Sequence, residues 1–258
     1  MTMAVISDIH GNLDALTAVL ADIARKDVER VVCLGDVVSF GPSPGECVDA
    51  IASIPEVAWV RGNHDRYIGE RSFLSKAFVD RWPAGFVENE QWTHSQLSSS
   101  QLTTLATLPP SAVMNAGSVE FHFFHATETS DEDFLWGDST AEEFEGKIGR
   151  GGIRVYGHIH HQYARTIPGT VYLNPGSVGF PFDGDPSTAY ALIRVADESV
   201  SVELVRIQYT VSNTIANLER NEVPWIGPIR SALEKSLSFF SPEVKAANDS
   251  RQYEVDRG

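Results

Sequence analysis

The feature that most constrains this sequence is a set of short apolar runs, each ending in residues that can bind a metal. Met3–Ser7, Val31–Leu34 and Val57–Val60 are such runs, and residues at helical spacing separate them. Strands that alternate with helices through short connections predict parallel pairing with right-handed crossovers. Because the ends of parallel strands share one edge of a sheet, we expect an α/β fold with its functional groups at that edge.

The chain length fits one large domain with a modest appendage. It has 258 residues, of which 42% are hydrophobic. We expect a main domain over residues 1–207, with a helical insertion at about 66–110 that ends at Pro109-Pro110. Residues 208–258 predict a C-terminal helical extension with a polar, disordered tail. This extension is long enough to pack across the sheet edge or against another subunit, so the oligomeric state stays open.

Charge and composition exclude several partners. Thirty-five acidic residues against twenty basic residues give a net charge of -15, which opposes the counterion release that drives bulk nucleic-acid binding. The sequence has no run of eighteen apolar residues and no basic-flanked leader, so we expect no membrane partner. Cys33 and Cys47 are too few for a disulfide framework, which favours a cytoplasmic location.

Metal-ligating residues follow the predicted strands. In Asp8-Ile9-His10 and His158-Ile159-His160, two ligands lie two positions apart, and in an extended chain such residues project to the same side. The ligands expected at the sheet edge are Asp8, His10, Asp36, Asn63, His125, His158 and His160. The absence of a thiolate separates this set from cysteine-based structural zinc sites. Seven ligands exceed the need of one ion, but with one bridging carboxylate they make two sets of four, as in a two-metal hydrolytic centre.

Each motif alone is weak, but together they resemble a known family. Five ordered blocks are similar to those of the calcineurin-like metallophosphoesterases over about residues 3–207. The blocks are Asp8-Ile9-His10-Gly11-Asn12, Gly35-Asp36 with Gly41-Pro42, Gly62-Asn63-His64-Asp65, His125 after an apolar run, and Gly157-His158-Ile159-His160. Asn174-Pro175-Gly176-Ser177-Val178-Gly179 resembles a segment of the small bacterial branch of predicted phosphodiesterases. The resemblance implies a four-layer α/β/β/α sandwich of two mixed sheets flanked by helices.

The resemblance also implies a role for each site residue. One metal would be held by Asp8, His10, Asp36 and His160, and the other by Asp36, Asn63, His125 and His158. The metals would be two divalent ions, with Mn²⁺ as first choice and iron, Zn²⁺ or Ni²⁺ as alternatives. A hydroxide bridging them would attack phosphorus in line. Asp36 and His64 would be catalytic, with His64 as general acid, and Asn12 and His64 would bind substrate.

These features favour a binuclear phosphodiesterase that acts on a small, nucleotide-like phosphate ester. The alternatives are a dinucleoside polyphosphate hydrolase or phosphomonoesterase, and, in a different class, a non-catalytic scaffold of the same fold. Ser39 and Phe40 stand where the protein-phosphatase branch has an Asp and an Arg, which argues against a dedicated phosphoprotein phosphatase. Asp65 either orients His64 or ends a turn.

Two other segments have less specific interpretations. Trp82, Phe86 and Trp92 favour packing within the insertion over a base-stacking platform. Residues 127–147 contain eight acidic residues and one lysine, which indicates a solvated, mobile face or a lid over the metals.

Overall fold

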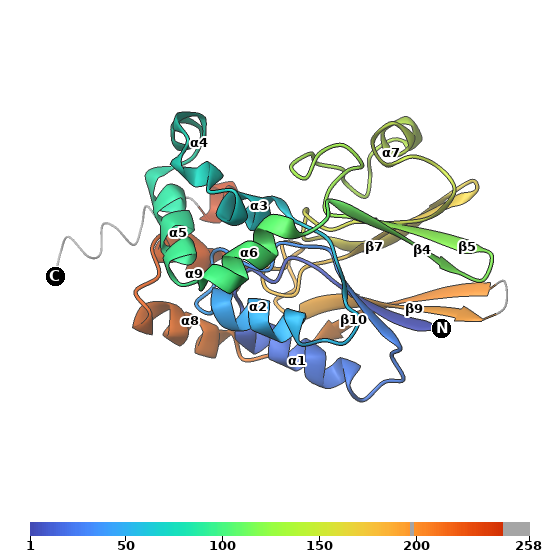
Figure 1. Ribbon diagram of the computed structural model, residues 1–258, viewed down its shortest axis with the longest axis horizontal. Helices are drawn as coiled ribbons and strands as arrows, with labels where there is room; N and C mark the ends of the chain where they lie inside the picture. Colours follow the sequence, from blue (N-terminus) through green and yellow to red (C-terminus); the bar gives the residue numbers. More distant parts are fainter. Residues whose placement is uncertain (197–198, 245–258) are drawn as a thin grey trace.

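Two five-stranded sheets form the centre of the computed structural model, which describes residues 1–196 and 199–244 (Figure 1). The first sheet has the order β10-β9-β1-β2-β3, and its members are β1 Thr2–Ile6, β2 Arg30–Cys33, β3 Ala58–Trp59, β9 Thr188–Ala196 and β10 Ser199–Ile207. The strands β1, β2 and β3 are parallel, whereas β9 is antiparallel to β1 and β10. The sheet is therefore mixed, as predicted.

The second sheet is mixed as well. Its order is β4-β5-β6-β8-β7, and its members are β4 Ser111–Ala116, β5 Val119–Phe124, β6 Gly152–Val155, β7 Gln162–Ile167 and β8 Thr170–Pro175. The central strands β5, β6 and β8 are parallel, and each edge strand is antiparallel to its neighbour. The parallel strands of both sheets supply the ends at which a site can form.

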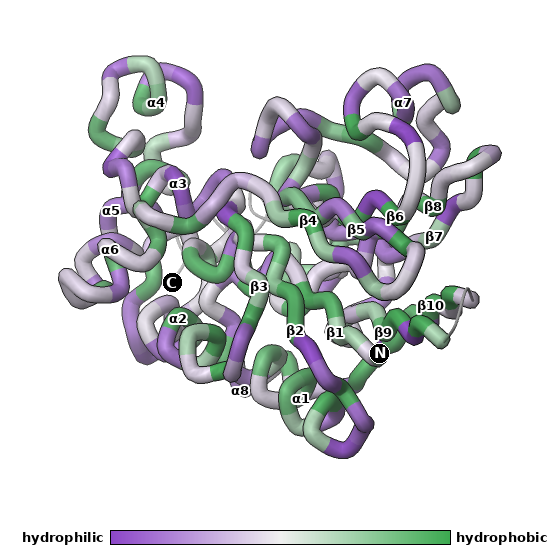
Figure 2. Tube along the Cα trace, turned by 45° about the vertical axis from the view of Figure 1, so that its right-hand side comes forward, coloured by the Kyte–Doolittle hydropathy of each residue, from purple (hydrophilic) through white to green (hydrophobic). Residues whose placement is uncertain are grey.

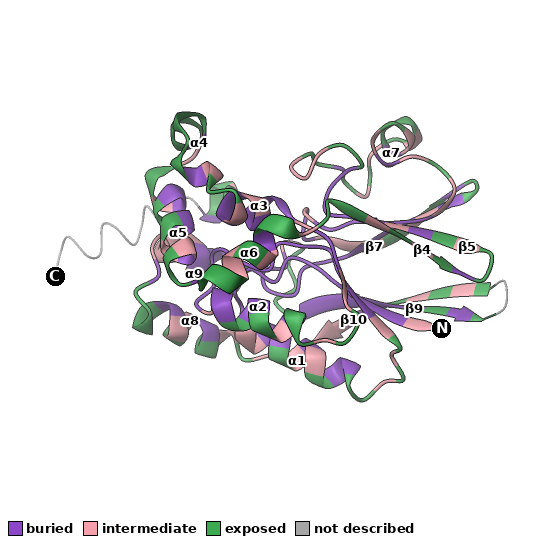
Figure 3. Cartoon of the chain, viewed as in Figure 1, coloured by how far each residue is buried: buried purple, intermediate pink, exposed green. Residues whose placement is uncertain are grey.

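Alternation along β1 explains why helices cover this sheet. Met3 and Val5 pack between the sheets with residues such as Phe121, whereas Ala4 and Ile6 pack on the other side among residues of the helices. Figure 2 shows β1, β2 and β3 as largely hydrophobic segments, and Figure 3 shows the buried residues concentrated in the middle of the molecule. The predicted four-layer α/β/β/α sandwich is confirmed.

Helices lie outside both sheets and beyond their ends (Figure 1). They are α1 Leu13–Ile23, α2 Pro44–Ala52, α3 Asn63–Gly69, the 3-10 helix η1 Ser72–Leu74, α4 Lys76–Arg81, α5 Ala84–Ser95, α6 Ser99–Thr107, α7 Ala141–Ile148, α8 Val211–Arg220 and α9 Ile226–Lys235. The helices α3 to α6 fill the predicted insertion. In the described part of the chain, no helix is long and apolar enough to cross a membrane.

The C-terminal extension packs against its own chain. The hydroxyl of Thr214 in α8 lies within hydrogen-bond distance of Asn12 Oδ1 at 3.1 Å and of Asp14 Oδ2 at 3.0 Å, which ties α8 to the start of α1. Packing on its own chain across the sheet edge is one of the two modes that the sequence left open. The disordered tail predicted for the end of the chain falls largely on residues 245–258, which lie outside the described residues.

One strand was missed by the sequence analysis. β4 forms an antiparallel hairpin with β5 and lies at the edge of the second sheet. Its residues alternate between exposed and half-buried positions except at Ala116, so an apolar face is barely visible in the sequence. Such a strand is stabilised mainly by pairing with its neighbour, and this pairing cannot be recognised in the local sequence.

Candidate metal centre

The structure brings all seven predicted ligands to one place, where parallel strands of both sheets end. Asp8 and His10 follow β1, Asp36 follows β2, and His125 directly follows β5. Asn63 begins α3, and the pair His158 and His160 follows β6. Six of these side chains are buried, and His158 is half-buried.

The ligand atoms fall into two groups that Asp36 joins. His160 Nε2 lies 3.3 Å from Asp8 Oδ1 and 3.2 Å from His10 Nε2. On the other side, His125 Nε2 lies 3.2 Å from Asp36 Oδ2, and His158 completes a cluster with these two residues. Asp36 Oδ2 is also 3.7 Å from His10 Nε2, so this one carboxylate lies between the groups.

The ligand pairs converge for a different reason from the one that we expected. Asp8 and His10 are not extended: their φ angles are 54° and 48°, and those of His158 and His160 are 67° and 59°. Non-glycine residues rarely adopt this left-handed region, and such strain persists only where surrounding bonds enforce it. Here the amides of Ile9 and His10 both donate to the carbonyl of Asp36, at 2.8 and 2.9 Å. The extended-chain argument was therefore wrong, although the convergence that it predicted is present.

Backbone carbonyls fix the orientation of each imidazole. The Nδ1 atoms of His10, His125 and His160 lie 3.1, 2.8 and 2.5 Å from the carbonyls of Val38, Leu34 and Phe180. In His158 it is Nε2 that faces a carbonyl, that of Glu132, at 3.2 Å. Because a carbonyl only accepts, the bonded nitrogen carries a proton, and the other nitrogen is the one that faces the centre and can bind a metal in its deprotonated form. Metal-ligating histidines have this second contact in most proteins.

Two buried oxygen atoms, one from Asp8 and one from Asn63, are placed where a cation could bind. Asp8 Oδ1 is buried without a hydrogen-bond partner. The amide of Asn63 presents its oxygen to Asp36, His125 and His158, although only the reversed amide would donate hydrogen bonds to these groups. A divalent ion would satisfy both oxygens. The donor set of imidazole, carboxylate and amide oxygen also suits Mn²⁺, iron or Zn²⁺.

The protonation states suit metal binding as well. Burial lowers the pKa of His10 to about 3 and that of His158 to about 4, so both rings are neutral at pH 7. Burial alone would raise the pKa of Asp8, but the neighbouring His160 and His125 lower it to about 2. For His125, burial is outweighed by the charges of Asp36 and Asp8, which raise its pKa to about 10. A cation would take the place of this proton.

His64 lies beside the cluster, with its ring centroid 5.1 Å from that of His10. Its Nδ1 donates to Glu90 Oε1 at 2.7 Å, and the other oxygen of Glu90 accepts from the hydroxyl of Ser39 at 2.7 Å. Burial opposes the charged form, but the carboxylates of Glu90 and Asp36 raise the pKa of His64. Glu90, which comes from α5 and is fully buried, was missed by the sequence analysis. The sequence did contain a sign of this role: Glu90 comes four positions after Phe86, which places an acidic side chain on the buried face of a helix.

Asp65 does not orient His64. Its two oxygens accept from the amides of Asp36, Val37 and Gly62, at 2.8 to 3.0 Å. Of the two roles that the sequence left open for Asp65, the structure shows the one in a turn. This turn carries Asp36, the carboxylate shared by the two ligand groups. Burial and the charge of Asp36 raise the pKa of Asp65 to about 6.

Asn12 is not brought into the site, contrary to our expectation that it binds phosphate. It is fully buried, and its Oδ1 caps α1 by accepting from the amide of Ala15 at 3.1 Å. Its Nδ2 donates to the carbonyl of Gly179 at 2.9 Å and to the hydroxyl of Tyr209 at 3.1 Å. The side chain is already fully bonded within the protein, so it has no free group for a substrate.

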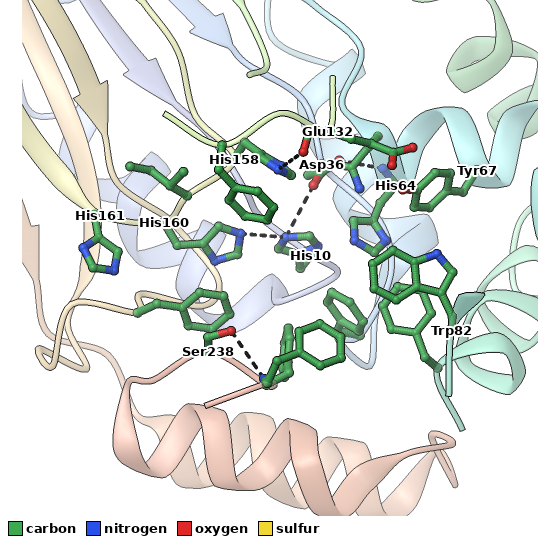
Figure 4. A pocket seen from close by; sticks show the side chains of 18 of the residues that line it. His10, Asp36, His64, Tyr67, Trp82, Glu132, His158, His160, His161 and Ser238 are labelled. Carbon is green, nitrogen blue, oxygen red and sulfur yellow. Dashed lines mark hydrogen bonds and ion pairs between the residues drawn. The ribbon is translucent and has the colours of Figure 1, made fainter. Parts of the chain in front are cut away.

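A cavity of about 780 Å³, counting its open mouth, lies over the ligand cluster. Figure 4 shows His10 and His160 facing it, with Trp82 and His161 on opposite sides of His10. Both Trp82 and Phe86 line this cavity, so their role is not limited to packing as we had expected. Trp92 does pack against the hydrophobic core.

The acidic segment at 127–147 borders the cavity and is tied to the helical insertion. Asp131 and Glu132 accept from the guanidinium of Arg66 at 2.6 to 2.8 Å, and Glu132 also accepts from Arg81 at 2.6 Å. These acidic residues are therefore bonded rather than simply solvated. The helix α7 begins within this segment, at Ala141.

Comparisons with known proteins agree with this geometry. A sequence profile of the calcineurin-like phosphoesterase superfamily domain matches residues 1–198. The uncharacterized protein MJ0912 of Methanocaldococcus jannaschii is 30% identical over 243 residues, covering 87% of this chain and 95% of that protein. Phosphodiesterase YfcE of Escherichia coli is 22% identical over 222 residues, covering 79% of this chain and 97% of that protein.

A solved structure agrees as well. The metallophosphoesterase from Sphaerobacter thermophilus superposes with a TM-score of 0.72 at 27% identity, covering 92% of this chain and 99% of that one. The profile match alone spans most of the chain. The chain therefore belongs to the calcineurin-like phosphoesterase superfamily, whose members are metal-dependent phosphoester hydrolases.

Proposed function

We propose that this protein is a binuclear phosphodiesterase that uses two divalent ions, with Mn²⁺ as the preferred metal. Asp8, His10 and His160 would hold one ion, and Asn63, His125 and His158 the other. The observation that carries the proposal is the position of Asp36, whose Oδ2 lies within 3.7 Å of His10 Nε2 and 3.2 Å of His125 Nε2. A single carboxylate between two ligand groups is what a pair of ions needs.

The chain's own residues would orient and protonate the substrate. When bound, divalent ions lower the pKa of water and neutralise charge on a phosphoryl group. His64 would donate a hydrogen bond to the phosphoryl group or a proton to the leaving oxygen. Glu90 supports this role because it accepts the hydrogen bond from Nδ1–H of His64 and raises the pKa of the ring, which favours the charged form of His64.

The proposed substrate is a small, nucleotide-like phosphodiester, and we place the protein in the cytoplasm. The loop at Ser39 and Phe40, which lacks the acidic and basic residues of the protein-phosphatase branch, is held by α5 instead. Ser39 donates to Glu90, and the amide of Phe40 donates to Asn89 Oδ1 at 2.9 Å. This arrangement supports a small-molecule substrate over a phosphoprotein.

Hydrolysis of bis-p-nitrophenyl phosphate by Mn²⁺-reconstituted protein tests the proposal. We expect Mn²⁺-dependent turnover that Asp36→Asn reduces by at least about a hundredfold, because that change removes the shared ligand. The matched control is Asp27→Asn at an exposed position, which leaves turnover unchanged. A panel of cyclic nucleotides, dinucleoside polyphosphates and monoesters then identifies the preferred ester. Activity without metal, or full activity of Asp36→Asn, would contradict the proposal.

A further inference from the structure

The cavity over the ligand cluster is walled by aromatic rings. Trp82 stacks on Phe86 with ring centroids 4.7 Å apart and planes 16° apart, and Phe240 of the C-terminal extension lies 5.8 Å from Trp82. From the acidic segment, Phe134 stacks on Trp136 at 5.7 Å and 7°. All of these side chains line the same cavity, although they come from three separate parts of the chain.

Several of these rings are exposed where burial would be expected. Phe134 is 55% exposed, Trp136 42% and Phe240 39%, and they are the three aromatic residues among the exposed large hydrophobic side chains of the described residues. Their common location at one cavity mouth argues against chance, since exposed apolar side chains that gather at one place mark binding sites.

The aromatic wall reaches the ligand cluster itself. The ring of Phe134 lies 4.9 Å from that of His158, and Phe182 stacks on His160 at 4.3 Å and 11°. A phosphoryl group at the cluster would therefore bring its ester substituents directly against these rings. Apart from His64 and the ions that the cluster would hold, positive charge is scarce there. Arg81 is the one arginine or lysine among the described lining residues, and its guanidinium is bonded to Glu132.

We propose that this cavity selects a phosphodiester with one negative charge and a planar aromatic substituent, which stacks against Phe134 and Trp136. This inference rests on the proposed function and narrows its substrate class. Aromatic faces bind planar rings by offset stacking, a contribution available to aryl groups and nucleobases alike. With its single guanidinium already paired, the cavity offers little compensation for the further charges of a polyphosphate chain.

Three stable phosphonates of equal charge test the proposal. Methyl phenylphosphonate and methyl cyclohexylphosphonate differ in ring planarity but not in charge, and methyl methylphosphonate lacks the ring. We expect the phenyl compound to inhibit hydrolysis of bis-p-nitrophenyl phosphate at least about fivefold more tightly than either of the others, the factor of one ring stack. Thymidine 5′-methylphosphonate compared with the phenyl compound then distinguishes nucleobase from simple aryl recognition.

Substitutions at exposed rings identify the side chains that cause the preference for the phenyl compound, and they do not remove buried packing. Phe134→Ala and Trp136→Ala should each remove most of the preference for the phenyl compound, and Phe134→Leu should remove it while keeping apolar area. Leu74→Ala, at a side chain that is 54% exposed outside the cavity, is the matched control and should keep the preference.

Calorimetric titration with methyl phenylphosphonate separates the two proposals, because it does not depend on turnover. Ring-selective binding without Mn²⁺-dependent hydrolysis would overturn the proposed function and leave the aromatic site standing. Hydrolysis with equal affinity for all three phosphonates, or a preference that Phe134→Ala and Trp136→Ala leave intact, would overturn the aromatic site alone.

Discussion

The carboxylate of Glu90 accepts a hydrogen bond from Nδ1 of His64 at 2.7 Å, and neither residue is exposed by more than a tenth. The bond joins two segments with different roles, since His64 follows β3 beside the ligand cluster and Glu90 belongs to α5 of the insertion. Glu90 also accepts from Ser39, so both of its oxygens are engaged. The helical insertion thus shapes the centre through His64 as well as walling the cavity.

Glu90→Gln should weaken catalysis through His64. The amide keeps the size of the side chain but removes the charge that favours the protonated imidazole, so proton transfer to the leaving oxygen suffers most. We expect kcat to fall about tenfold or more for a diester with an alkoxide leaving group and much less for p-nitrophenolate. Steady-state kinetics on the two substrate types measures the difference. The control is Glu88→Gln on the exposed face of the same helix. Equal losses on both substrates would indicate a merely structural role for Glu90.

Gly62→Ala should displace the shared carboxylate. The φ of Gly62 is −87°, which suits any residue, so the constraint is space: an added Cβ would overlap Asp36 Oδ1 and the Asp36 amide. We expect loss of metal content and activity together with a melting temperature lowered by several degrees. Gly146→Ala in α7 is the matched control, because its Cβ meets nothing within 4 Å and the helix gains up to about 1 kcal/mol. Retention of metal by Gly62→Ala would show that the loop can move aside.

Asp22 should make the fold sensitive to acid. Burial alone would raise its pKa, but a hydrogen bond from the Tyr190 hydroxyl at 2.5 Å and the charge of Lys26 lower it below 3.8. A carboxyl whose pKa is depressed in the folded state stabilises the protein above its unfolded pKa, and this stability is lost as pH falls through the folded value. Asp22→Asn should therefore cost about 1 kcal/mol at pH 7 and less near pH 3. Urea unfolding at both pH values, with Asp27→Asn as control, measures this. An equal cost at both would mean that the ionised carboxylate is not the source.

The sequence predicted the structure best where a residue could bind a metal and also followed a predicted strand. Short strands followed by Asp, Asn or His predicted an α/β fold and the gathering of seven ligands, because parallel strands must end at a common edge. The four-layer sandwich was predicted from the family resemblance instead. Glu90 was missed since its partner His64 lies 26 residues away, a contact that depends on how α5 packs. The left-handed φ angles of Asp8 and His10 were missed for a similar reason: bonds to Asp36 in another loop enforce them.

The aromatic cavity shows the same limit. Trp82 and Phe86 have the spacing of ordinary packing residues, and Phe240 lies in an extension that the sequence did not place. Only the fold shows that these rings and Phe134 share one cavity. Substrate selection thus depends on contacts between distant segments, whereas the metal ligands are recognisable within short motifs.

A crystal structure of Mn²⁺-loaded protein, with anomalous scattering recorded at the manganese edge, tests the central claim most directly. We expect two peaks about 3.5 to 4 Å apart on either side of the Asp36 carboxylate, one near Asp8, His10 and His160 and the other near Asn63, His125 and His158. Asp36→Asn should lose one or both peaks. The absence of any peak at these side chains in the loaded wild-type protein, or a single peak remote from Asp36, would contradict a binuclear centre.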